Sequence, residues 1–118
     1  MAGYWTDLEV HTQAELQRYL VKADVLHREG DLGSIPPIEF VLHGDEAKLF
    51  LKDNYSNHQE TVDLAAKLSA FGIVNIRVCE RWMGGQSLDA SLLVPFVGSV
   101  ELASAEIKRL EKARYRRF

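Results

Sequence analysis

The strongest constraint on the fold is an alternation between short runs of β-branched and aromatic residues and longer segments with helical periodicity. Strands are predicted at 4–11, 38–44, 73–79 and 95–100, with a short edge strand at 114–118. Parallel neighbours need a connection of a dozen or more residues, usually a helix, so this order favours right-handed crossovers and a mostly parallel sheet. The sequence therefore predicts an α/β fold, a three-layer α/β/α sandwich.

Capping residues mark the ends of the two longest predicted helices. Thr12 followed by Glu15, and Asn57 followed by Glu60, are capping-box patterns. Gly72 suits the left-handed position just past the end of the second helix. Further helices are expected near 45–51, 87–93 and 104–114, with loops at 52–57 and around the glycines at 84–85.

Composition limits the class of protein. The chain has 118 residues, of which 47% are apolar and 26% charged, so we expect one soluble domain spanning 1–118. No apolar run approaches the roughly 18 residues of a membrane helix, and the acidic start lacks a signal pattern. A lone cysteine forms no internal disulfide, so the cytoplasm is the expected compartment.

The charge balance argues against nucleic acid as a partner. The net charge of −3 does not suit a protein that binds by neutralising phosphates. The basic segment 112–118 is the exception, but basic residues at the end of a helix also complement its dipole and are usually solvated.

Two residues with chemical potential come at the ends of predicted strands. His43 follows the second strand and Cys79 ends the third. The carboxyl ends of parallel strands meet at one edge of the sheet, where ligands and reactive groups gather. If these strands are neighbours, His43 and Cys79 lie at the same edge, and Cys79 is expected to be accessible there.

Cysteine supplies chemistry that a hydroxyl does not. A thiolate is a strong nucleophile and can hold a second sulfur as a persulfide. A free cysteine has a pKa of about 8.5, so reactivity near neutrality needs a nearby cation or backbone dipole. Arg81, Arg77 and a protonated His43 are the candidate cations. Two simpler readings stay open: Cys79 as a small hydrophobic residue, and His43 as a turn residue.

The residues after Cys79 form a second group of candidates. Trp82 and Met83 could line a pocket or an interface, or simply pack, and Gly84 with Gly85 offers flexibility or a weak anion cradle. The chain has no His-x-x-x-His pair and no phosphate-binding glycine motif, so neither a metal nor a cofactor is expected.

The segments 38–50 (IEFVLHGDEAKLF), 68–79 (LSAFGIVNIRVC) and 106–118 (EIKRLEKARYRRF) together resemble the DsrE/DsrF-like (YchN-like) sulfur-relay family. The resemblance covers essentially the whole chain. It implies a five-stranded parallel sheet between helical layers, with Cys79 at the family's cysteine position and His43-Gly44 after the second strand. Some relatives carry Cys-x-x-Cys here, whereas this chain has Trp82 in the second place.

The resemblance implies a sulfur carrier, a possible sulfurtransferase that holds a persulfide on Cys79 and exchanges it with a protein donor and acceptor. The alternative is a non-catalytic oligomeric interaction module of the same fold.

A homo-oligomer is also expected, commonly a trimer or hexamer in that family, with a dimer possible. Aromatic residues near presumed edges and loops (Trp5, Trp82, Phe96 and Phe118) favour it. Light scattering that gives the mass of one chain at micromolar concentration would exclude it.

Overall fold

The computed structural model describes residues 2–30 and 32–118, and it has a five-stranded sheet at its centre. All the strand pairs are parallel, and the order across the sheet is β4-β3-β2-β1-β5. The strands are β1 (Tyr4–Thr6), β2 (Ile38–Leu42), β3 (Val74–Cys79), β4 (Gly98–Val100) and β5 (Arg116–Arg117). The predicted parallel sheet is confirmed, including the short edge strand near the end of the sequence.

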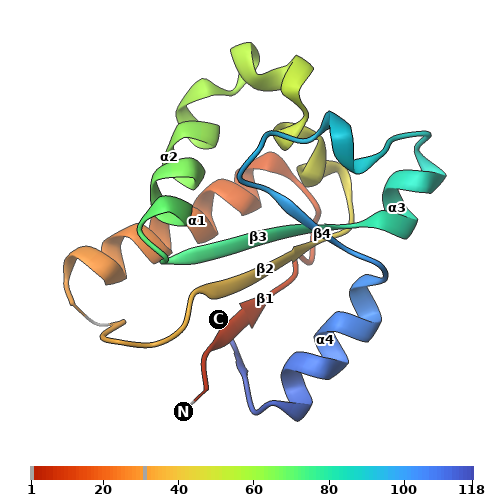
Figure 1. Ribbon diagram of the computed structural model, residues 1–118. Helices are drawn as coiled ribbons and strands as arrows, with labels where there is room; N and C mark the ends of the chain where they lie inside the picture. Colours follow the sequence, from red (N-terminus) through yellow and green to blue (C-terminus); the bar gives the residue numbers. More distant parts are fainter. Residues whose placement is uncertain (1, 31) are drawn as a thin grey trace.

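Helices cover both faces of the sheet (Figure 1). Helices α1 and α2 lie on one face, α4 lies on the other, and α3 follows the carboxyl end of β3. The α-helices are α1 (Gln13–Arg28), α2 (Gln59–Ala70), α3 (Glu80–Gly85) and α4 (Ala103–Lys112). The 3-10 helices are η1 (Asp45–Phe50), η2 (Lys52–Asn57) and η3 (Ala90–Leu92). The three-layer α/β/α sandwich is therefore confirmed.

Strand β2 shows why the two faces of the sheet differ. Its five residues are all buried, as expected for a central strand covered on both sides. Ile38, Phe40 and Leu42 belong to the larger core beneath α1 and α2, whereas Val41 belongs to a smaller cluster with Trp5 and Cys79. Because side chains alternate along a strand, the residue just after Leu42 returns to the α4 face.

The start of α1 confirms half of the predicted capping box. The backbone N–H of Glu15 donates to Thr12 Oγ1 at 3.2 Å. The Glu15 carboxylate does not return to Thr12 but accepts from the backbone N–H groups of Glu9 and Val10, each at 2.8 Å. Glu15 therefore fixes the loop between β1 and α1, which carries residues of the candidate site.

Some predicted element ends were wrong. The first strand ends at Thr6 rather than at position 11. Helix α2 is preceded by His58 without a side-chain cap, so Asn57 does not cap it. The glycines expected in a loop at 84–85 end helix α3, and 52–57 forms the 3-10 helix η2. Gly72 does adopt a left-handed conformation, with φ of 72°.

None of the helices within the described ranges is long and apolar enough to cross a lipid bilayer.

Candidate functional site

Three neighbouring strands deliver chemically capable side chains to one pocket. Asp7 follows β1, His43 follows β2 and Cys79 ends β3. All three line a pocket of about 350 Å³. Its other lining residues come from α3 and from the start of α4: Trp82, Leu102, Ala103, Ser104 and Ile107. The prediction that His43 and Cys79 lie at one edge of the sheet is confirmed, and their shared pocket places them on the same face.

Cys79 receives a hydrogen bond from the start of α4. The backbone N–H of Ala103, the first residue of this helix, donates to Cys79 Sγ at 3.4 Å. The N-terminus of a helix carries a partial positive charge, and its first N–H groups have no partner inside the helix. This contact places a hydrogen-bond donor and the positive end of a helix at the sulfur.

The expectation that the Cys79 side chain is accessible to solvent was wrong. Cys79 is only 3% exposed, because the first turn of α4 covers the end of β3. The apolar neighbours of Cys79 nevertheless do not enclose it completely, since the same pocket is lined by the polar side chains of Asp7 and His43.

His43 and Asp7 form a hydrogen-bonded pair. His43 Nε2 lies 3.1 Å from Asp7 Oδ2, with both side chains mostly buried. The hydrogen bond to Asp7 raises the pKa of His43 above its ordinary value, against the opposing effect of burial. The same hydrogen bond lowers the pKa of Asp7. The geometry therefore favours an imidazolium–carboxylate pair in the pocket that contains the thiol.

A second histidine, His11, and a buried carboxylate, that of Glu46, contact His43. Glu46, fully buried in η1, accepts from the backbone N–H of His43 at 3.2 Å. Its other oxygen lies 3.0 Å from His11 Nδ1. The His11 ring packs edge-on against the His43 ring, with centroids 4.6 Å apart.

Gly44 leaves room for that second histidine. A Cβ added at Gly44 would approach three atoms of the His11 side chain more closely than 3.0 Å. Gly44 is buried, and the constraint that the structure shows at this position is steric.

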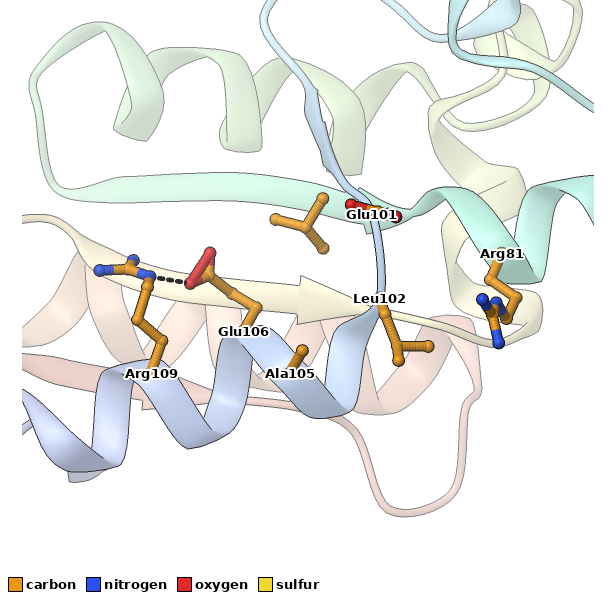
Figure 2. Close-up of a pocket in the computed structure, with 7 residues that line it drawn as sticks. Arg81, Glu101, Leu102, Ala105, Glu106 and Arg109 are labelled. Carbon is orange, nitrogen blue, oxygen red and sulfur yellow. Dashed lines mark hydrogen bonds and ion pairs between the residues drawn. The ribbon is translucent and has the colours of Figure 1, made fainter.

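The predicted cations Arg81 and Arg77 do not line the Cys79 pocket. Arg81 lines a neighbouring pocket of about 460 Å³, where Figure 2 shows it at α3, apart from the ion pair between Glu106 and Arg109. The Arg77 guanidinium is paired with Glu39 and with Glu106. Of the three candidate cations, only His43 lines this pocket, and the N-terminus of α4 provides a second positive group there.

The residues after Cys79 separate into three environments. Trp82 is half-buried; it lines the Cys79 pocket and also packs against the core, two of the roles that the sequence left open. Met83 is 1% exposed in the core and presents nothing to a partner. Gly84 and Gly85 are exposed and close α3, so they do not form an anion cradle beside Cys79.

Sequence reasoning missed four contributors: Asp7, His11, Glu46 and the backbone of Ala103. Asp7 was missed because the first strand was predicted to continue to position 11, which placed Asp7 inside the strand rather than after its end. Among the residues that the structure describes, no group of three or more His, Cys, Asp or Glu side chains is arranged to hold a metal ion.

Comparison with known proteins supports the fold. No family model and no curated protein matches the chain. A solved structure of a protein of unknown function, MTH1491 from Methanobacterium thermoautotrophicum, is similar with a TM-score of 0.70 and 19% identity. The similarity covers 99% of this chain and 96% of that one. At this identity it shows a shared fold and carries no statement about activity.

Proposed function

We propose that this protein carries a sulfane sulfur as a persulfide on Cys79 and passes it to an acceptor protein. The observation that carries the proposal is the environment of the sulfur. Cys79 Sγ accepts an N–H from the first residue of α4 and shares its pocket with the His43–Asp7 pair. Both features favour a negatively charged sulfur.

The proposed chemistry is exchange between a thiolate and a sulfur–sulfur bond. In the first step the Cys79 thiolate attacks one sulfur of a hydrogen polysulfide. A new S–S bond forms on Cys79, the donor's S–S bond breaks, and its electron pair leaves on the shortened hydropolysulfide or hydrosulfide. In the second step an acceptor thiolate attacks the outer sulfur, and Cys79 leaves as a thiolate.

The pocket contributes to both steps in the same way. Cys79 is a thiolate before the first step and again after the second, so groups that stabilise its negative charge favour attack and departure. The N–H of Ala103 is fixed in the backbone and needs no reorganisation. The His43 imidazolium adds a charge whose position is set by Asp7.

The direct test is sulfur loading followed by intact mass measurement. Wild-type protein incubated with sodium polysulfide should gain about 32 Da, one sulfur atom, and lose it with dithiothreitol. The matched control is Cys79→Ser, which removes the only cysteine and should gain nothing. Wild-type protein that gains no mass while retaining its fold would contradict the proposal.

The burial of Cys79 favours a second candidate, the non-catalytic interaction module. A cysteine that is 3% exposed also behaves as a small core residue. In that case Cys79→Ser would leave any partner binding unchanged, and wild-type protein would resist polysulfide.

The homo-oligomer stays a prediction. Of the aromatic residues that favoured it, Trp5 is buried within the chain, whereas Trp82, Phe96 and Phe118 are partly buried against the core.

A further inference from the structure

The basic segment near the end of the sequence brings one side chain, that of Arg117, into contact with Asp7 of the candidate site. Strand β5 pairs with β1, placing Arg116 beside Tyr4 and Arg117 beside Trp5. The Arg117 guanidinium lies over the Trp5 ring, 4.7 Å from its centroid. Trp5 belongs to the apolar cluster that contains Cys79, so Arg117 approaches the sheet on the face of the pocket.

Arg117 holds Asp7 at two points. Its Nη2 lies 2.9 Å from Asp7 Oδ1 and also donates to the Asp7 backbone carbonyl at 3.1 Å. The Trp5 ring supplies a third contact through its π face. The guanidinium is therefore fixed, although its side chain is 45% exposed.

The two oxygens of Asp7 are divided between two partners. Oδ1 forms the ion pair with Arg117, and Oδ2 faces His43 Nε2. A carboxylate held at one oxygen cannot rotate freely, so the contact with Arg117 keeps the second oxygen directed at the imidazole.

We infer that Arg117 is a positioning residue of this site, which orients Asp7 so that Asp7 holds the His43 imidazolium beside Cys79. The purpose of holding the imidazolium near Cys79 rests on the proposed function. It gives the basic segment a role within the chain in place of nucleic-acid binding.

The other charged or titratable groups around His43 do not substitute for Asp7. Glu46 in η1 contacts the backbone N–H of His43, and the His11 ring from the loop after β1 packs against its face. Cys79 on β3 lines the same pocket, while the residues that α4 places there are Ala103, Ser104 and Ile107, which are uncharged.

The test is an NMR titration of the His43 ring protons in variants of the whole chain. In Arg117→Gln, His43 should titrate at lower pH than in wild type, because the Asp7 carboxylate is free to turn away. Asp7→Asn should shift the titration further in the same direction, and Arg117→Lys should restore part of the wild-type behaviour. The matched control is Arg116→Gln, which removes the same charge from an exposed neighbour and should leave His43 unchanged.

The reactivity of Cys79 gives a second readout. Alkylation of Cys79 by iodoacetamide at pH 7 should slow about threefold in Arg117→Gln. On a logarithmic scale this is half of the tenfold slowing that corresponds to a loss of about 1.4 kcal/mol of stabilisation. Exposed ion pairs add little to stability, so Arg117→Gln should remain folded.

Failure of this inference can be separated from failure of the proposed function. If Arg117→Gln titrates like wild type while Asp7→Asn shifts, Arg117 does not position Asp7, whatever sulfur loading shows. If the titration shifts as expected but wild-type protein takes up no sulfur, the positioning role stands and the sulfur-carrier function fails.

Discussion

Replacing Gly44 with alanine is expected to destabilise the protein by about 1–3 kcal/mol, the usual cost of overpacking a well-filled site. Gly44 has extended backbone angles, φ of −151° and ψ of −164°, that any residue adopts. The cost is therefore steric. The added methyl would meet the Cγ, Nδ1 and Cβ atoms of His11, which lie close to the His11 backbone and cannot swing aside cheaply.

Displacing His11 would also disturb the candidate site. The His11 ring contacts the buried Glu46 carboxylate and packs against the His43 ring. A shift of His11 would therefore break its contact with Glu46 and move the His43 ring. Urea unfolding of Gly44→Ala should show a lower midpoint with an unchanged slope.

The control for this prediction is Gly84→Ala. An added Cβ at Gly84 meets nothing within 4 Å, and Gly84 lies in helix α3. This variant should be neutral or more stable by about 0.4–1 kcal/mol, because alanine restricts the unfolded chain. Equal midpoints for Gly44→Ala and wild type would show that His11 is not fixed against Gly44.

The sheet could be predicted because its signals are local. Buried strands such as Ile38–Leu42 are short apolar runs, and intervening helical segments require parallel pairing. The meeting of His43 and Cys79 followed from one general rule about the carboxyl ends of parallel strands. The same rule gives Asp7 only when the first strand ends at Thr6, as it does in the structure, and not at position 11, as predicted.

The rest of the site depends on contacts between residues distant in the sequence. The hydrogen bond from Ala103 to Cys79 joins residues that are 24 positions apart in the sequence. The hydrogen bond from Arg117 to Asp7 joins residues that are 110 positions apart. Arg81 was named together with His43 and Arg77 as a candidate cation for Cys79, but α3 carries Arg81 to a different pocket. No local pattern in the sequence records which helix end or edge strand covers a given strand.

His11 shows a second reason why parts of the site could not be predicted from the sequence. Its backbone adopts a positive φ of 35°, uncommon for a residue other than glycine, and this conformation is set by the surrounding contacts. Glu15 fixes the preceding loop and Glu46 holds the ring. Each partner is an ordinary charged residue whose role appears only after folding.

The second large effect is expected for the reactivity of Cys79 when His43 is removed. At pH 7, His43→Ala should slow alkylation by iodoacetamide about tenfold, which corresponds to the loss of about 1.4 kcal/mol of charge stabilisation. The hydrogen bond with Asp7 raises the pKa of His43, so the imidazolium persists to higher pH than in an unpaired histidine. As the pH rises through that raised pKa, the imidazolium loses its charge, and the two proteins should converge.

The measurement that tests the central claim most directly is the rate of Cys79 alkylation against pH for wild type, His43→Ala and His27→Ala. His27 is an exposed histidine at the end of α1 and serves as the matched control. The account predicts a wild-type profile that exceeds that of His43→Ala at and below neutrality, meets it at alkaline pH, and coincides with that of His27→Ala. Superimposable profiles for wild type and His43→Ala would contradict it, because His43 would then have no influence on the sulfur.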